Sequence, residues 1–479
     1  MQQGVVLFAM VLPWLWPYTT GPLPNAWPLM VSWACIFVFL AVLAIGTMER
    51  AEWPDLVARG WLVAALISSV LALAQWFEAL PSWSFLATPV TGRAYANLRQ
   101  PNHFASLTSL GLLGLMWLAR RARAPWHWIA LLLLAGGNAA SVSRTGLIQW
   151  LVITVMVAWW RPAHRTARLR VCMAGLTAYA LWAMLLPKLL YLFRGINLHS
   201  ASFRMGQDLG CSSRKVLWSN VLELIAKRPW TGWGWGELDY AHYAHLYAGP
   251  RFCDILDNAH NLPLHLAVEL GVPIAAAFLV ALGLWVWRQR PWFEDDPGRQ
   301  LAWCALAVIG LHSLLEYPLW YGPFQLGLLA SLVLLAHGSW GPTTRAAVAG
   351  FAGAGVLALA VLYAQYDTVS QAYLPTAQRR PAFRDDPVVA AKRVIFFQTQ
   401  LRFAQLSITP LTIANAAQVH ALAGEMLHFS PEPSVIEKTI ESAVMLGHKA
   451  DGLWHLARYR AAFPDDYMRW RTKMSIAVN

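Results

Sequence analysis

Long apolar windows recur along the sequence and constrain the fold more than any other feature. About 20 apolar residues suffice to cross a bilayer as a helix, and the chain holds about eleven windows near that length. They lie at 5–18, 27–47, 60–80, 104–119, 126–142, 145–160, 171–193, 262–287, 301–316, 320–338 and 345–364. With a mean hydropathy of +0.42 and only 13% charged residues, the composition excludes a soluble globular protein. We expect an all-α, polytopic membrane protein with about eleven transmembrane helices.

Composition agrees with a membrane location. The 27 tryptophans suit the lipid headgroup zone, where an indole ring has one apolar and one wet side. The first 18 residues lack a basic region and a small-residue cleavage site, so we interpret them as a retained span. The net charge of +12 is largely dispersed over short loops, where the positive-inside rule explains it. No nucleic-acid partner is expected.

Basic residues in the short loops predict the orientation of the spans. Short loops after odd-numbered windows hold only Arg93, Arg99 and Arg144. Loops after even-numbered windows are richer and hold Arg50, Arg59, Arg120, Arg121, Arg123, Arg161, Arg165, Arg168, Arg170, Arg288, Arg290, Arg299 and Arg345. The even loops and the N-terminus are therefore predicted to be cytoplasmic.

In this orientation, every polar cluster that could carry a chemical function lies on the outer face. The clusters are 97–103, 141–146, 312–318 and the long polar interval 194–260, which includes Arg204. We expect the domains to be 1–193 with seven spans, 194–261 as a large periplasmic catalytic loop, 262–364 with four spans, and 365–479 as a periplasmic helical domain. One face of the membrane is predicted to carry the site.

The C-terminal part has an ordinary soluble composition with helical apolar spacing. A Phe-Ser-Pro run at 429–431 and a Phe-Pro-Asp run at 463–465 begin about 34 residues apart, the period of tetratricopeptide hairpins. Two copies leave both a tetratricopeptide-like domain and an irregular helical cap open.

Five cysteines divide into two groups. Cys35, Cys172 and Cys304 lie in or at the ends of predicted spans, whereas Cys211 and Cys253 share the outer loop. An oxidising periplasm would pair the second group. We predict a disulfide between Cys211 and Cys253.

His260 precedes a predicted helix start. Asn261 is a plausible N-cap with Pro263 in the first turn, which puts His260 at the water boundary. A neutral imidazole there is suited to act as a general base on a hydroxyl group. An interfacial histidine that bonds a loop carbonyl is the alternative, and spacing alone favours it.

Two histidine–glutamate pairs have helical spacing. His265 and Glu269 are four residues apart, as are His312 and Glu316, so each pair shares a helix face. A zinc site is one interpretation. Because no His-Glu-x-x-His run is present, hydrogen bonds between helices are the simpler one, and no metal is expected.

Three arginines lie beside polar motifs on the predicted outer face, namely Arg99, Arg144 and Arg214. A guanidinium group offers a rigid fork of donors for phosphate oxygens, which suits a lipid diphosphate. Each is alternatively a headgroup anchor.

The Thr-Gly-Trp-Gly-Trp-Gly run at 231–236 has the wrong spacing for a dinucleotide fingerprint and predicts a tight turn.

Together these motifs resemble a known family. Arg-Lys-Val-Leu-Trp at 214–218, the Lys-Arg-Pro-Trp-Thr-Gly-Trp-Gly-Trp-Gly run at 227–236 and His-Asn-Leu-Pro-Leu-His at 260–265 resemble the core of the bacterial O-antigen ligase and polymerase superfamily. The runs at 97–104 and 312–318 resemble its branch of O-linked oligosaccharyltransferases, which glycosylate pilins and other periplasmic proteins. The resemblance covers 96–321.

The resemblance implies a GT-C-like glycosyltransferase of the bacterial inner membrane, without metal or other cofactor, whose active site faces the periplasm. The donor would be an undecaprenyl-diphosphate-linked oligosaccharide among membrane lipids, and the acceptor a pilin or pilin-like protein. His260 matches the family's loop histidine, and Arg144 and Arg214 best match its diphosphate-binding arginines.

The branch motif supplies Arg99, Gln100 and Asn102, although many relatives have glycine where this chain has Arg99. The further supporting candidates are His103, Asn261, His265, Glu269, His312, Glu316 and Tyr317. A lipopolysaccharide O-antigen ligase and a lipid-linked glycan transporter remain as alternatives.

Overall fold

The computed structural model describes residues 1–19, 21–46, 48–80, 86–88, 91–119, 125–160, 165–198, 210–336 and 340–478. Within these ranges every regular element is an α-helix or a 3-10 helix, which confirms the all-α prediction. Arg204 of the polar interval and four arginines of the topology argument, Arg120, Arg121, Arg123 and Arg161, lie outside the described residues.

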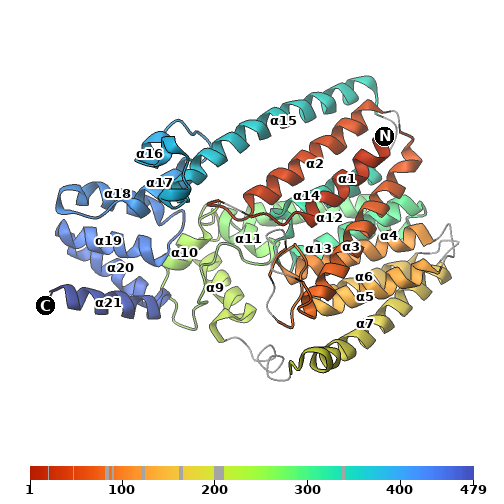
Figure 1. Cartoon of the computed structure of the whole chain (residues 1–479), viewed down its shortest axis with the longest axis horizontal. Coiled ribbons are helices and arrows are strands. Elements are labelled where there is room, and N and C mark those ends of the chain that lie inside the picture. The colour runs from red at the N-terminus through yellow and green to blue at the C-terminus, as the bar shows by residue number, and fades with distance from the viewer. Residues whose placement is uncertain are drawn as a thin grey trace. The chain divides into compact units, whose positions relative to one another are not determined.

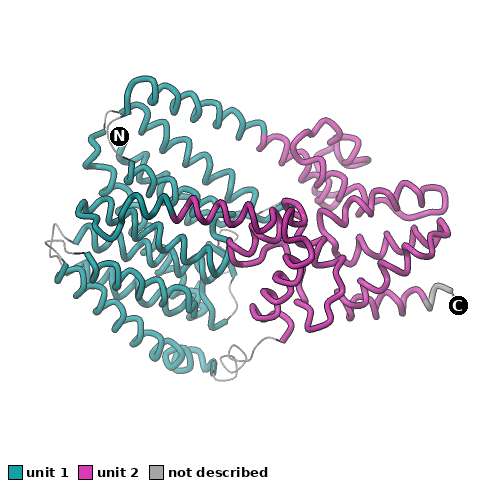
Figure 2. Tube along the Cα trace, turned by 180° about the vertical axis from the view of Figure 1, so that it is seen from behind, with its two compact units in different colours: residues 1–204, 284–361 teal, residues 205–283, 362–479 magenta. Residues whose placement is uncertain are grey.

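The described residues form two compact units (Figure 2). Unit 1 comprises 1–204 and 284–361, and unit 2 comprises 205–283 and 362–479. The predicted outer loop and the C-terminal region thus belong to one unit. The division falls inside two continuous helices, α12 (Val272–Gln289) and α15 (Pro342–Ser370).

Unit 1 is a helical bundle with the character of an integral membrane protein. Besides its parts of α12 and α15, it contains α1 (Gln2–Leu15), α2 (Ala26–Ile45), α3 (Trp53–Trp76), α4 (Pro101–Ala119), α5 (Trp126–Ala140), α6 (Arg144–Trp159), α7 (Arg165–Arg194), α13 (Pro297–Ser313) and α14 (Gly322–Leu335). Figure 1 shows α5, α6 and α7 lying side by side.

Five helices in the described part of the chain are long and apolar enough to cross a membrane. They are Ala26–Ile45, Arg50–Trp76, Arg165–Arg194, Val272–Phe293 and Pro342–Tyr373. The chain is therefore a polytopic membrane protein. Each predicted window coincides with helix, but a total of eleven spans stays a prediction.

One predicted window is divided. The apolar run 262–287 is interrupted at Gly271, which separates α11 (Leu262–Leu270) from α12. Gly271 has φ of 87°, a left-handed conformation that ends a helix and that glycine adopts readily. His265 and Glu269 therefore lie on a short helix that precedes the candidate span Val272–Phe293, and not within one continuous helix over 262–287.

The central helix of unit 1 is α4, in which every residue from His103 to Trp117 is buried. It packs against α3, α5, α6 and α13. Small residues permit the closest approach, because a Cβ at Gly114 would overlap the carbonyl oxygen of Ala58 in α3. Close backbone contact of this kind is how helices associate where lipid offers no hydrophobic driving force.

Unit 2 contains the outer-loop helices and the C-terminal helices. The former are α9 (Arg214–Lys227), α10 (Leu238–Ala244) and α11, and the latter are α16 (Pro387–Ala390), α17 (Gln398–Ile408), α18 (Ala416–Met426), α19 (Pro433–Met445), α20 (Lys449–Ala462) and α21 (Pro464–Val478). Successive C-terminal helices pack against one another, as in α18 with α19 and α19 with α20. Their assignment to tetratricopeptide repeats stays a prediction.

The outer loop has a hydrophobic core of its own. Leu217 and Val221 of α9 pack with Leu238, Phe252 and Val268. A second core joins the loop to the C-terminal helices, because Tyr243 of α10 is buried among residues of α18 and α19. From Leu217 to Ala259 the polar interval thus contributes buried side chains to a folded core.

We predict that Gly114→Ala destabilises unit 1, because the added methyl group overlaps backbone that cannot move freely. Overpacking of this kind costs about 1–3 kcal/mol, so the melting temperature of the purified protein in detergent should fall. Gly310→Ala in α13 is the matched control, since a Cβ there meets nothing within 4 Å. Equal melting temperatures for the two variants would contradict the prediction.

Candidate active site

Asn102 joins three sequence motifs at one end of unit 1. Its Nδ2 donates to Oε1 of Glu316 over 2.9 Å, and its Oδ1 accepts from the Ser143 hydroxyl over 2.6 Å. The first turn of α4, the N-cap of α6 and the segment after α13 are therefore held by one amide side chain. Three of the four polar clusters singled out in the sequence, 97–103, 141–146 and 312–318, thus meet within this unit.

His312 belongs to a buried network one turn deeper in the bundle. Its Nδ1 lies 2.8 Å from the hydroxyl of Ser106, which also accepts from Nε2 of Gln149 over 2.7 Å. Gln149 in turn accepts from Ser109 over 2.9 Å. His312 therefore makes a hydrogen bond between α13 and α4. This is the simpler of the two interpretations given for its pair with Glu316.

Two hydrogen-bonded pairs, Glu316 with Asn102 and His312 with Ser106, join α4 to α13 and to the segment that follows α13. Glu316 and His312 are four residues apart, and so are their partners Asn102 and Ser106. Helical spacing identified the first pair. Ser106, Ser109 and Gln149 were missed, although polar residues inside an apolar window are a signal that a partner must exist.

Aromatic rings surround His103 at this end of unit 1. The ring centroid of His103 lies 4.1 Å from that of Tyr321 and 5.3 Å from that of His312. Tyr317 packs 5.7 Å from Tyr321. His103 is buried, so the described structure gives it a packing contact in place of an exposed polar role.

The segment before α4 is anchored by the side chains of its own motif. Asn97 donates to the Leu15 carbonyl over 3.0 Å, and Arg99 donates to the Pro17 carbonyl over 2.7 Å. Gln100 accepts from the backbone N–H of His103 over 2.8 Å and so caps the helix. Arg99 and Gln100 therefore orient the motif, and phosphate binding by Arg99 stays a prediction.

Gln75 is a positioning residue that sequence inspection missed. Its amide nitrogen donates to the carbonyls of Ala87 and Ala96, and its oxygen accepts from the backbone N–H of Ala96 over 2.8 Å. One buried amide thus folds the chain that leads into α4.

Arg144 and Arg214 occupy equivalent local positions. Each is the first residue of a helix, α6 or α9, and each follows a serine whose hydroxyl accepts a backbone N–H of the first turn over 3.4 Å. Arg144 is exposed. A guanidinium beside the positive end of a helix dipole adds to a field that attracts anions. The arrangement suits phosphate oxygens in both units.

His260 lies in unit 2 with its backbone in a left-handed conformation, φ 50°. Its N–H donates to Oδ1 of Asn258 over 2.9 Å, and the preceding Ala259 carbonyl accepts from Nε1 of Trp218 over 3.1 Å. Asn261 is the predicted N-cap and accepts from Leu264 over 3.0 Å. Such a conformation costs about 1 kcal/mol or more and persists where surrounding contacts impose it, often at functional sites.

The glycine-rich turn at 231–236 closes the other end of α11. Trp233 donates its N–H to the Val268 carbonyl and Gly234 to that of Glu269, both over 2.9 Å. A Cβ at Gly232, where φ is 68°, would overlap the Glu269 carbonyl oxygen. The turn supplies donors for carbonyls that the helix leaves unpaired, which agrees with the turn predicted from the sequence.

Two titratable groups of α11 and one of α10 have displaced pKa values. Burial raises the pKa of Glu269 to about 7, against hydrogen bonds from Gly236 and Leu238 that lower it. Burial and the charge of His260 lower the pKa of His265 to about 4. Asp239 of α10, which the sequence did not single out, also has a pKa raised to about 7 by burial.

His265 and Glu269 pair within α11, with Nε2 and Oε2 3.5 Å apart. No three His, Cys, Asp or Glu side chains gather as metal ligands in the ranges that the structure describes.

The structure pairs Cys211 with Cys253, whose Cα atoms are 5.3 Å apart. This is the pair predicted from the sequence. The bridge ties the residues just before α9 to the segment that leads to His260, while Cys35, Cys172 and Cys304 are buried thiols.

Three family models match the chain. They describe a protein glycosylation ligase over residues 94–119, an O-antigen ligase over 129–279 and the C-terminal part of a virulence factor membrane-bound polymerase over 300–476. The chain is thus similar to O-antigen ligases and to protein glycosylation ligases over these ranges. The first two matched ranges contain the Asn102 motif and His260, respectively.

Two proteins from Acinetobacter baylyi are similar to this chain. A general O-oligosaccharyltransferase is 23% identical over 374 residues, or 75% of this chain, and a ComP-specific O-oligosaccharyltransferase is 25% identical over 297 residues, or 60%. The chain spans 65% and 53% of their lengths. Both relatives are oligosaccharyltransferases, that is, glycosyltransferases.

Glu269→Gln should flatten the pH dependence of stability. With a folded-state pKa of about 7, raised from 4.5, the contribution of Glu269 to the free energy of unfolding is largest below pH 4.5 and falls as the pH rises through 7. The drop in melting temperature between pH 5 and pH 8 should therefore be smaller in the variant than in the wild type.

Asp385→Asn is the control for this prediction, because that carboxylate is exposed. It should keep the wild-type pH profile. The same slope in Glu269→Gln as in the wild type would show that Glu269 does not carry the effect.

Proposed function

We propose that this protein is an O-linked oligosaccharyltransferase of the bacterial inner membrane. It would move a glycan en bloc from undecaprenyl diphosphate to a serine or threonine of a pilin or another periplasmic protein. The observation that carries the proposal is His260, held in a left-handed backbone at the start of α11 within the segment that matches O-antigen ligases. The names of the two relatives support the protein acceptor.

His260 would act as the general base. Its neutral imidazole takes the proton of the acceptor hydroxyl while that oxygen attacks the anomeric carbon of the glycan. The bond from that carbon to the diphosphate oxygen breaks, and undecaprenyl diphosphate leaves with the electron pair. A single displacement of this kind inverts the anomeric configuration.

Asp257 would support the proton transfer. Desolvation raises the pKa of Asp257 and the charge of His260 lowers it, so the two groups interact. By reciprocity, the carboxylate stabilises the imidazolium that forms when His260 accepts the proton.

Arg144 and Arg214 would neutralise the leaving diphosphate. Both lie at helix starts, where the macrodipole is positive, and a guanidinium binds two phosphate oxygens at once. Fixed positive groups that face a developing negative charge lower the barrier without reorganisation.

The C-terminal helices would present the acceptor protein to the outer loop. Tyr243 of α10 bonds His455 of α20 over 2.8 Å, and Arg458 donates to the Ala244 carbonyl over 2.7 Å. His428 pairs with Glu237 over 2.7 Å. Because these contacts join the loop and the C-terminal helices in one unit, binding at either affects the other.

His260→Ala should lower glycan transfer by about 10² to 10⁴ fold, the usual contribution of a general base. Transfer is measured from purified lipid-linked donor to a pilin peptide, with membrane insertion and melting temperature as checks on folding. His448→Ala, which changes an exposed histidine of the C-terminal helices, should transfer at the wild-type rate. Wild-type transfer by His260→Ala would rule out the base assignment.

Arg144→Ala and Arg214→Ala should raise the donor concentration needed for half-maximal transfer, and more so than the corresponding lysine variants. Lysine keeps the charge but loses the fork of donors. Arg93→Ala, which changes an exposed arginine on the same predicted face, is the control. If the alanine and lysine variants behave alike, bulk positive potential is enough and specific diphosphate binding is wrong.

A lipopolysaccharide O-antigen ligase is the second candidate, favoured by the match over residues 129–279. Donor and chemistry would be the same, with a lipid A-core sugar as acceptor. Offering both acceptors in the same assay separates the two enzymes. Transfer to neither, with donor moved across the membrane, would indicate the transporter.

A further inference from the structure

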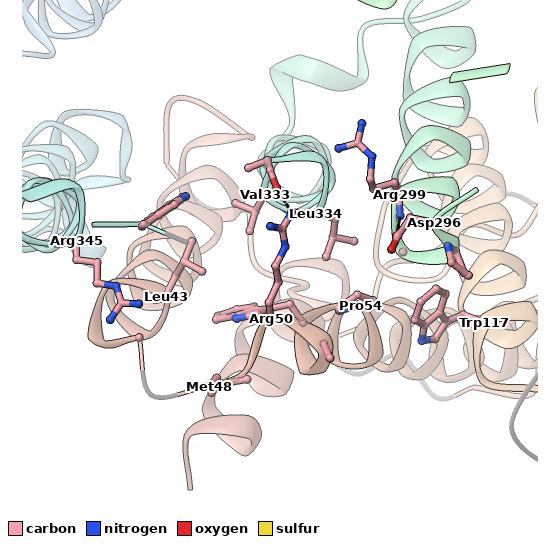
Figure 3. Close-up of a pocket in the computed structure, with 17 residues that line it drawn as sticks. Leu43, Met48, Arg50, Pro54, Trp117, Asp296, Arg299, Val333, Leu334 and Arg345 are labelled. Carbon is pink, nitrogen blue, oxygen red and sulfur yellow. Dashed lines mark hydrogen bonds between the residues drawn. The ribbon is translucent and has the colours of Figure 1, made fainter. Parts of the chain in front are cut away.

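A pocket of about 630 Å³ lies within unit 1 at the end away from Asn102 (Figure 3). Asn102 is in the first turn of α4, whereas Trp117, in the last turn of that helix, lines the pocket. The ends of α2 and α14 and the starts of α3, α13 and α15 complete the wall. By the positive-inside rule this is the cytoplasmic end.

Two of the arginines that line the pocket are held by the C-terminal end of α14. Arg50 donates to the Ala336 carbonyl and Arg299 to the Leu335 carbonyl. Arg299 also pairs with Glu294 over 2.7 Å. Arg299 also donates to Oε1 of Gln289 over 3.3 Å, and these bonds fix the two guanidinium groups in place.

The third arginine, Arg345, lies against Gly46, the left-handed residue that ends α2. In the described part of the chain its guanidinium has no hydrogen-bond or ion-pair partner. Among the described lining residues Asp296 supplies the sole carboxylate, and Asp296 already caps α13 by accepting from Arg299 over 2.8 Å. Positive charge in the pocket therefore exceeds negative charge.

The rest of the wall is apolar and aromatic. Leu43, Leu334, Trp53 and Trp340 line it. Indoles favour the headgroup zone of a bilayer, and a free phosphate ion would leave the apolar wall unused. A neutral lipid would leave the arginines unused.

We propose that this pocket binds the headgroup of an anionic phospholipid. The phosphate sits between Arg345 and Arg50, and the acyl chains run along Leu43 and Leu334. Basic pockets between transmembrane helices bind acidic phospholipid headgroups in this way. The inference concerns a site separate from His260 and does not depend on the proposed transferase activity.

Native mass spectrometry of the full chain tests the proposal by titration with phosphatidylglycerol and with phosphatidylcholine of the same acyl chains. The wild type should retain one phosphatidylglycerol in clear preference. Arg345→Gln should weaken that binding about tenfold, the effect of losing one hydrogen bond between charged groups. Arg288→Gln removes the same charge from an exposed arginine outside the pocket and should bind like the wild type.

Equal binding of both lipids by the wild type, or equal loss in both variants, overturns the proposal. Competition experiments separate the possible sources of the phosphate group. If millimolar inorganic phosphate displaces the lipid, the pocket is an ion site. If a polyprenyl phosphate at equal concentration displaces it, the pocket belongs to the donor lipid. Either result overturns a phospholipid site. If Arg345→Gln does not fold, salt tests the wild type, because ionic strength raised to about 1 M should reduce the preference for phosphatidylglycerol.

Discussion

Hydrocarbon offers no hydrogen-bond partners, so every polar side chain inside the helical bundle needs a protein partner. Around the first turns of α4 in unit 1, three amides provide such partners. Gln75 folds the segment before α4, Asn102 joins three motifs, and Gln149 lies beneath them with Ser106 and His312. The position of Arg144, one residue after Ser143, follows from this paired polar layer.

In unit 2, side chains are held in position by other interactions than buried amides. Its loop has a small hydrophobic core and a disulfide, and α11 is closed at both ends, by Asn261 at its start and by the glycine turn at its end. The strained backbone of His260 lies at the first of these ends. Rigid surroundings are what a general base needs, because small displacements are costly to catalysis.

The arginines of the molecule occupy two contrasting electrostatic settings. Arg50 and Arg299 bond the carbonyls at the end of α14, where the helix dipole is negative and stabilises a cation without any ligand. Arg144 and Arg214 begin helices, where the dipole is positive and disfavours a cation. A bound anion therefore stabilises the guanidinium groups at helix starts more than those at the end of α14. For this reason Arg144 and Arg214 are the better candidates for binding a doubly charged diphosphate.

The sequence alone determined the helices, the N-cap at Asn261, the turn at 231–236 and the resemblance to O-antigen ligases, because these depend on local pattern and spacing. Tertiary structure decided what spacing does not contain. The break at Gly271 depends on where the turn docks, and the partners of His312 and Glu316 depend on which helix faces α13. Periodicity identifies the face of a helix that needs a partner, but Ser106, Gln149, Gln75 and Asp239 gain their roles only when distant segments pack together.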